Sequence, residues 1–192
     1  MAKDVQDQKQ QLILEAAREA FASYGFRKTS MDDIARGAGL SRASLYLHYR
    51  NKEDIFRSLV LQCYDACASI LHDILSDEGA LAEVLERAFL AQSEIVVRPL
   101  LNSSHGLELL DAGNAAASDL VVEGEKRIRS LYARWLQRRA DMGGADLPEG
   151  ADAIALAVGA SLKGAKIVAS DYDEYCRIVT AQAQILGRAL SR

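Results

Sequence analysis

Proline and cysteine are scarce in this chain of 192 residues, with two prolines, Pro99 and Pro148, and three cysteines, Cys63, Cys67 and Cys176. Because proline breaks helices, and because the good helix formers Ala, Leu, Glu and Arg are plentiful, the composition predicts an all-α fold. Three cysteines form an odd set in a chain of this size, and they favour reduced thiols over a disulfide framework. Reduced thiols are typical of a cytoplasmic protein.

Long apolar runs are also lacking. The chain begins with the polar stretch "MAKDVQDQKQ", and its longest uncharged helical run, residues 153–162, is too short to cross a bilayer. The sequence therefore predicts no membrane span and a location in the cytoplasm. No internal repeat or low-complexity tract suggests a repeat architecture.

An excess of positive charge is absent too, since the net charge is -4 and the isoelectric point is near 5.4. This excludes a protein that coats nucleic acid along its whole surface, but it leaves room for a local patch. Residues 34–52, "IARGAGLSRASLYLHYRNK", hold four Arg or Lys, one His and no acid. A surface that lies against phosphates should lose its carboxylates, so this segment indicates a DNA contact. The alternative is a solvated face that lacks acids by chance.

Hydrophobic periodicity and capping signals divide the chain into about nine helices. Ser30 with Asp33 has the spacing of a capping box, Gly25 and Gly39 are placed to end helices, and Ser41 and Asn51 are placed to cap them. The predicted helices cover residues 8–24, 31–38, 41–49, 51–76, 80–97, a sixth starting at Pro99, 120–142, 151–170 and 172–190. The clearest loop is "GGADLPEG".

Ala35, Gly39 and Leu45 have the spacing of a helix-turn-helix. In that motif a small residue lets two helices approach, a glycine makes the turn, and an aliphatic residue of the second helix packs on the first. Further apolar positions, namely Phe21, Phe26, Ile34 and Ala38, complete a candidate three-helix core. The acid-free segment coincides with the second helix of this motif and its flanks.

Residues 13–56, "ILEAAREAFASYGFRKTSMDDIARGAGLSRASLYLHYRNKEDIF", resemble without a gap the amino-terminal domain of the TetR family of one-component transcriptional regulators. The resemblance lies in "AFASYGF", "TSMDDIA", "AGLSRASLY" and "NKEDIF". It covers about a quarter of the chain, and the remainder resembles the family in length and helical character. It implies a helix-turn-helix DNA-binding domain over residues 1–55 and a helical ligand-binding and dimerisation domain over residues 56–192.

The resemblance also implies roles for individual residues. Thr29 and Ser30 would meet phosphate, Arg42, Ala43 and Ser44 would face base edges, and Tyr46, His48 and Lys52 would contact the DNA backbone or the groove wall. Arg42 is the expected reader of a guanine. This chain has Arg42-Ala43-Ser44 where the family commonly has Lys-Gly-Thr, and Tyr49 where Phe is usual. We interpret Tyr49 as a core residue.

In the second domain, six residues are candidates for an effector pocket, although aromatic residues at helical spacing are more often core. They are Tyr64, Cys67, Phe89, His105, Tyr132 and Trp135. Such a pocket would suit a mostly apolar small molecule with one or two polar groups. For Cys63, Cys67 and His72, buried thiols are favoured over a metal or redox site. For His105, loop capping is an equal alternative.

Small residues four positions apart could let helices pack closely, either within one chain or across two. They are Ala151, Ala155 and Gly159 in one helix and Ala183 and Gly187 in another. A homodimer is favoured, because one short recognition helix reads too few bases and a symmetric pair reads two half-sites.

The function predicted from the sequence is a ligand-responsive transcriptional regulator, usually a repressor in this family. It would bind a palindromic double-stranded DNA operator as a homodimer and be released by a small-molecule effector. The alternatives are an all-helical enzyme and a protein-interaction module. No catalytic cluster, glycine-rich phosphate loop or HExxH helix appears, so the sequence predicts no enzymatic activity, no cofactor and no metal.

Overall fold

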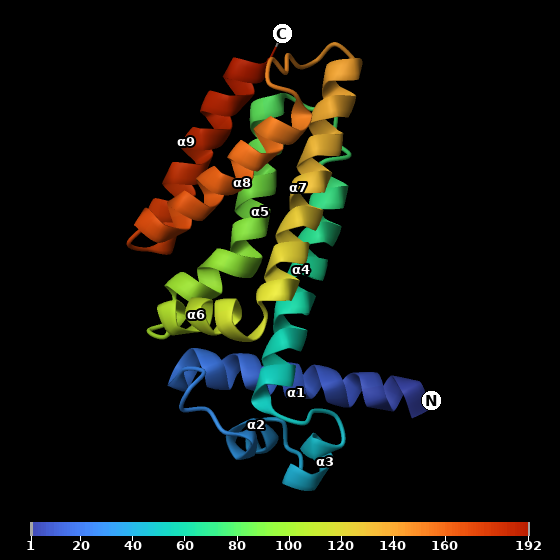
Figure 1. Ribbon diagram of the computed structural model, residues 1–192, viewed down its shortest axis with the longest axis vertical. Helices are drawn as coiled ribbons and strands as arrows, with labels where there is room; N and C mark the ends of the chain where they lie inside the picture. The colour runs from blue at the N-terminus through green and yellow to red at the C-terminus, as the bar shows by residue number, and fades with distance from the viewer. Residues whose placement is uncertain (1, 192) are drawn as a thin grey trace. The chain divides into compact units, whose positions relative to one another are not determined.

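Helices make up the whole regular structure of the part of the chain that the computed structural model describes, residues 2–191 (Figure 1). Side chains are described from residue 6 onward, apart from those of residues 113 and 114. The nine helices of this part are α1 (Ala2–Tyr24), α2 (Met31–Gly37), α3 (Arg42–Tyr46), α4 (Lys52–Ile74), α5 (Leu81–Leu101), α6 (Gly106–Ala116), α7 (Ser118–Asp141), α8 (Ala151–Val168) and α9 (Tyr172–Leu190). The prediction of an all-α fold with about nine helices is confirmed.

Contacts within the chain divide it into two compact units. The first unit holds the residues up to Gln62 together with Asn102–Val121, which supply α1, α2, α3, the start of α4 and α6. The second holds Cys63–Leu101 and the chain from Val122 onward, which supply the rest of α4, α5, most of α7, α8 and α9. Helix α6 thus groups with the first unit, although the sequence places it in the second domain. The division of function at residues 55 and 56 stays a prediction.

An apolar core joins the helices of the first unit. Ile13 of α1, Ile34 of α2, Leu45 of α3 and Ile55 of α4 are fully buried. Burying one side chain of this kind stabilises the fold by about 1.5–3 kcal/mol, so this core holds the short helices in place. Three aromatic rings complete it, with centroids 5.1–5.7 Å apart: Phe21, Phe26 and Phe56.

Helix α6 is tied to the end of α1 by hydrogen bonds. The hydroxyl of Ser103, just before α6, donates to the carbonyl of Ala22 at 2.8 Å. A carboxylate oxygen of Glu108 accepts from the backbone amide of Arg27 at 2.7 Å. Between them Gly25 adopts a φ of 80°, and a Cβ there would overlap the Glu108 side chain. The positive φ favours glycine at this point, and a side chain there would also displace the Glu108 carboxylate.

Arg57 and Asp119 form an ion pair within the first unit. Both guanidinium nitrogens of Arg57 donate to the carboxylate of Asp119 at 2.7 Å, and one also donates to the carbonyl of Ala116 at 3.0 Å. The paired guanidinium lowers the pKa of Asp119 to about 2. The ion pair therefore joins α4 to the start of α7 wherever this carboxylate is ionised.

In the second unit, α5 and α9 approach each other closely. A Cβ added to Gly187 of α9 would overlap the backbone of Ala82 in α5. Ala183, one turn earlier, is fully buried. The small residues of α9 therefore serve packing within the chain. A Cβ added to Gly159 of α8, in contrast, would meet no described atom within 4 Å.

Three predicted helix limits differ from the structure. Pro99 does not start a sixth helix but lies inside α5, which ends two residues later, so the single amide hydrogen bond that proline cannot make is lost near the helix end. Helix α3 ends at Tyr46 rather than near Tyr49, because the chain turns there through hydrogen bonds from Leu47 to Ser44 and from His48 to Leu45. Helix α1 begins at Ala2.

A membrane-spanning helix is absent from residues 2–191, since no helix in this range combines the length and the apolar character that a bilayer requires.

Candidate DNA-binding surface and effector cavity

The helix-turn-helix of the first unit is positioned by local capping. The hydroxyl of Ser30 accepts from the amide of Asp33, and the carboxylate of Asp33 accepts from the amide of Ser30, so the predicted capping box is confirmed. Ser41 accepts from the amide of Ser44 at 3.1 Å and caps α3. Gly39 makes the turn between the two helices with a φ of 66°. These bonds satisfy amides that a helix start leaves free, and so they place α3 without help from distant residues.

Helix α3 presents one face to solvent. Arg42, Ala43 and Tyr46 are exposed, and Leu47 just after the helix is 86% exposed. The guanidinium of Arg42 lies 5.5 Å from the ring centroid of Tyr46 and donates to Asp32 of α2 at 3.0 Å. The Tyr46 hydroxyl, followed by the Asp32 carboxylate, raises the pKa of Arg42, so this side chain is positively charged. An exposed, oriented guanidinium at the start of a short helix can read a base edge in the major groove.

Each arginine of the acid-free segment pairs with a carboxylate outside it or at its edge. The three pairs are Arg36 with Asp33 at 3.1 Å, Arg42 with Asp32 at 3.0 Å and Arg50 with Asp54 at 3.8 Å. Exposed ion pairs are weak, because water and salt compete for both partners. DNA phosphates can therefore replace these carboxylates.

Two residues predicted to contact DNA make hydrogen bonds within the protein, and their contact with DNA stays a prediction. The Thr29 side chain is 1% exposed, and its hydroxyl donates to the carbonyl of Gly25 at 2.7 Å. The ammonium of Lys52 donates to three carbonyls, those of Phe26, Arg27 and Thr29, at 2.7, 3.0 and 3.0 Å. An ammonium has three donors, so all of them are used in closing the loop between α1 and α2.

The other predicted DNA contacts lie at or near the surface. Ser30 is exposed, and Ser44 and His48 are partly exposed. Tyr49 is buried, and its hydroxyl accepts from Gln10 at 3.1 Å, so its interpretation as a core residue is confirmed. The sequence analysis missed Arg27 and Lys28, both exposed in the turn before α2. Two adjacent basic residues before a capped helix were the available signal.

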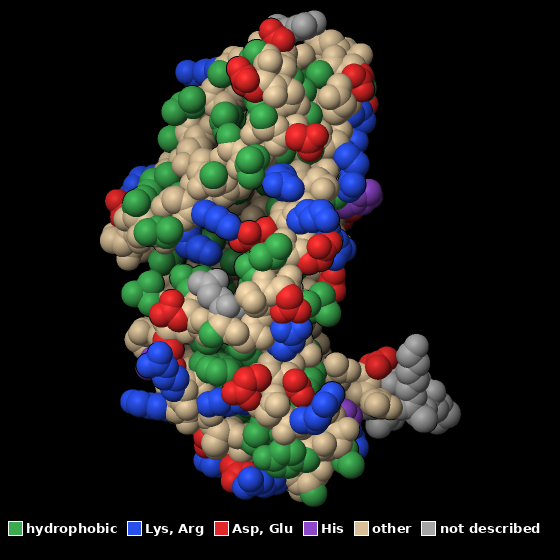
Figure 2. Space-filling model, viewed as in Figure 1, with side chains coloured by type: hydrophobic (Ala, Val, Ile, Leu, Met, Phe, Trp, Pro, Cys, Tyr) green, Lys and Arg blue, Asp and Glu red, His purple; other side chains and the backbone are tan. Residues whose placement is uncertain are grey.

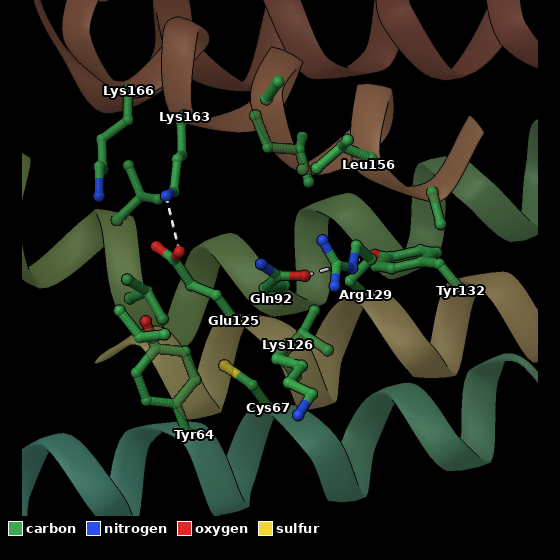
Figure 3. A pocket seen from close by; sticks show the side chains of 18 of the residues that line it. Tyr64, Cys67, Gln92, Glu125, Lys126, Arg129, Tyr132, Leu156, Lys163 and Lys166 are labelled. Carbon is green, nitrogen blue, oxygen red and sulfur yellow. Dashed lines mark hydrogen bonds and ion pairs between the residues drawn. The ribbon is translucent and has the colours of Figure 1, made fainter. Parts of the chain in front are cut away.

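The second unit encloses a cavity of about 420 Å³ between side chains of α4, α5, α7, α8 and α9. Three predicted pocket residues line it, namely Tyr64, Cys67 and Tyr132 (Figure 3). Tyr64 rests on Gly124 of α7, where any Cβ would overlap its ring. Burial raises the pKa of both tyrosines, so their hydroxyls stay neutral. The hydroxyl of Tyr132 donates to Gln92 of α5 at 3.4 Å.

The other three predicted pocket residues do not line the cavity. Phe89 is buried behind it, with its ring 6.0 Å from that of Tyr132. Trp135 is also core. His105 belongs to the first unit, where its amide donates to the Ser103 hydroxyl and its ring lies 3.5 Å from Glu108. Of the two interpretations of His105, the structure supports loop capping.

Charged residues also line the cavity, and the sequence analysis missed all of them. They are Glu125, Lys126 and Arg129 of α7 and Lys163 and Lys166 of α8. In the sequence they resemble the solvated face of an amphipathic helix, and only the packing of α7 beside α8 brings them to one site.

Cys67 lines this cavity. Burial raises the pKa of its thiol to about 12, so it stays protonated at neutral pH. His72 is exposed. Among the described side chains no group of three His, Cys, Asp or Glu residues is arranged to hold a metal ion.

Comparison with known proteins finds a family match over the amino-terminal part of the chain. Residues 13–59 match the family model described as bacterial regulatory proteins, tetR family. The negative transcriptional regulator IcaR of the biofilm operon icaADBC of Staphylococcus epidermidis is 40% identical over 53 residues, which are 28% of this chain and 29% of that protein. The chain spans less than a third of the length of the curated relatives that it matches at 37% and 40% identity.

Solved structures share the fold over nearly the whole chain. A transcriptional regulator from Cytophaga hutchinsonii has a TM-score of 0.80 at 21% identity, covering 95% of this chain and 98% of its own. A SmeT-triclosan complex has a TM-score of 0.71 at 18% identity, covering 96% and 92% of the two chains. SmeT is the repressor of the multidrug efflux pump SmeDEF of Stenotrophomonas maltophilia.

Proposed function

Because residues 13–59 match the family model of the tetR family of bacterial regulatory proteins, we propose that the chain is a regulator of this family, that it represses transcription by binding a palindromic operator as a homodimer, and that a small molecule releases it. The members of this family are transcriptional regulators and not enzymes. The observation that carries the proposal is the exposed face of α3, where Arg42 stands on a capped helix beside the small Ala43. A location in the cytoplasm, where the DNA lies, is part of the proposal.

The short recognition helix favours a dimer. Helix α3 has five residues, so one copy reaches few base pairs, and two copies related by a two-fold axis would read two half-sites. The outer faces of α8 and α9 supply an apolar surface for such a partner. Ile167, Val168 and Ile185 are each at least half exposed there.

The cavity of the second unit is the proposed effector site. It is built from five helices, so a ligand that prefers one arrangement of these helices shifts the protein toward that arrangement. Helices α4 and α7 supply residues to both units, which gives such a shift a path along the chain. A solved complex of a structurally similar repressor with triclosan supports a small-molecule effector.

Selection of bound duplexes from a random pool with the purified protein tests the proposal. We expect the selected duplexes to share an inverted repeat and to bind two copies of the chain. An asymmetric site bound by one copy would contradict the dimer. A protein that binds every duplex equally would contradict operator recognition.

A further inference from the structure

We propose that the cavity of the second unit binds an amphipathic anion, a molecule with an apolar body and one acidic head group such as a carboxylate or a sulfonate. The inference deepens the proposed function, and it rests on that function for the statement that the bound anion acts as the effector. Its basis is the set of positive charges that line the cavity, in a chain whose net charge is negative.

The walls of the cavity are apolar. Tyr64, Val97, Ile128, Tyr132, Leu162 and Tyr175 line it and are buried or partly buried. Such walls suit a hydrocarbon or aromatic body, because burying apolar area is favourable wherever it leaves no polar group unpaired. The neutral hydroxyl of Tyr132 and the side-chain amide of Gln92 supply polar groups within this site, and Figure 3 shows the hydrogen bond between them.

Cations surround this apolar space. Lys126, Arg129, Lys163 and Lys166 line the cavity together with one carboxylate, that of Glu125. Figure 2 shows Lys and Arg side chains gathered round a hollow over α7 and α8, with an acidic side chain between them. Since four positive groups face one negative group, the site has an excess of positive charge that an anion would neutralise.

Most of these cations have no acceptor among the side chains and carbonyls that the structure describes. The Lys163 ammonium donates to Glu125 at 2.7 Å, as Figure 3 shows. Among the described residues the side chains of Lys126, Arg129 and Lys166 make no hydrogen bond. Burial, opposed by Glu125 and reinforced by Lys163, lowers the pKa of Lys166. An anionic head beside this partly buried ammonium would supply the missing acceptor.

Two fluorescent probes with the same aromatic body test the inference without DNA. Anilinonaphthalene sulfonate carries an acidic head, and phenylnaphthylamine lacks it. We expect the purified full chain to bind the sulfonate about three- to tenfold more tightly than the neutral probe, from fluorescence titration. Equal affinities, or tighter binding of the neutral probe, would overturn the inference.

Variants locate the preference in the cavity. Lys163→Gln combined with Lys166→Gln should weaken sulfonate binding more than binding of the neutral probe, and so reduce the preference at least about twofold, because two of the four cations are removed. Glu125→Gln should strengthen sulfonate binding about two- to fivefold, because it removes the competing carboxylate and frees Lys163. Arg177→Gln, an exposed cation of α9 outside the cavity, is the control and should change neither affinity. Circular dichroism checks that each variant is folded.

The outcomes separate the inference from the proposed function. A sulfonate preference that is undiminished in Lys163→Gln with Lys166→Gln would overturn the inference and leave operator binding untouched. A preference that is reduced in this variant, but not in Arg177→Gln, supports the inference. If the bound sulfonate then fails to weaken operator binding in a mobility-shift assay, the inference still stands, and the release mechanism of the proposed function is contradicted.

Discussion

At the scale of single residues, the guanidinium of Arg42 is the group placed to read a base. We expect Arg42→Ala to weaken binding to the preferred operator about five- to a hundredfold per half-site and to change binding to unrelated duplexes little, because the base edge loses its hydrogen-bond partner while the phosphates keep theirs. Isotherms on operator and scrambled duplexes measure the difference. An equal loss on both would assign Arg42 to phosphate instead.

Lys52 and Arg50 form a pair of cations with contrasting roles. Lys52→Met should lower the free energy of unfolding by about 1–3 kcal/mol, because three carbonyls of the α1–α2 loop lose their charged donor. Arg50→Gln should leave stability unchanged, since the Arg50 side chain is 94% exposed. Urea unfolding measures both effects.

The salt dependence of DNA binding separates the same two residues. If Arg50 exchanges Asp54 for a phosphate, Arg50→Gln should reduce the slope of log K against log salt by about 0.9 for each phosphate that the variant no longer neutralises. Lys52→Met should leave that slope unchanged, because its ammonium is engaged within the protein. A reduced slope for Lys52→Met would restore the phosphate role that the sequence suggested.

Residue types alone predicted the DNA-binding segment but not which of its side chains are free. Ser30 and Arg42 were correctly expected at the surface, since a cap and the exposed face of a helix follow from local spacing. The hydrogen bonds of Thr29 and Lys52 within the protein were not expected, because their partners are backbone carbonyls of a loop whose path depends on packing. A hydroxyl and an ammonium look the same in a sequence whether they face solvent or a carbonyl.

At the scale of helices, Gly187 sets the approach of α9 to α5. Gly187→Ala should lower the free energy of unfolding by about 1–3 kcal/mol despite the better helix propensity of alanine, because the new methyl overlaps the backbone of Ala82. Gly164→Ala in α8 is the matched control, since no described atom lies within 4 Å of its Cβ position. It should gain about 0.5–1 kcal/mol.

Thermal unfolding of the two glycine variants provides the measurement. If Gly187→Ala were as stable as the parent, the close approach of α5 and α9 would be wrong. If Gly164→Ala were destabilised, its side of α8 would be covered by something other than solvent.

Helix boundaries were predictable where a cap marks them and less so elsewhere. Ser30, Ser41 and Asn51 act within three residues of themselves, and all three caps are present. The prediction that a helix starts at Pro99 was wrong, because a proline can lie either at the start of a helix or in its last turns. The charged side of the cavity was missed because Glu125 and Lys163 are separated by most of α7 and part of α8, and no local pattern links them.

At the scale of the whole molecule, the exposed apolar faces of α8 and α9 predict association. Ile185 is 67% exposed, and Ile185→Glu should raise the dissociation constant of the dimer at least about tenfold, because a charge would then be buried at an apolar interface. Met142, 55% exposed beyond α7, provides the control in Met142→Glu. Light scattering across a dilution series measures both, and a dimer unaffected by Ile185→Glu would place the interface elsewhere.

The hydrogen bonds between α6 and the end of α1 affect the order in which the parts of the chain can fold during synthesis. The first unit is discontinuous, so its amino-terminal helices lack the bonds from Ser103 and Glu108 until the ribosome has released the chain through Val121. The rest of α4 and all of α5 emerge before that, and they must not pack against the surface of α1 that α6 later contacts. For the same reason, a chimera that grafts only residues 2–62 onto another regulator would transfer the recognition helix without the segment that completes its unit.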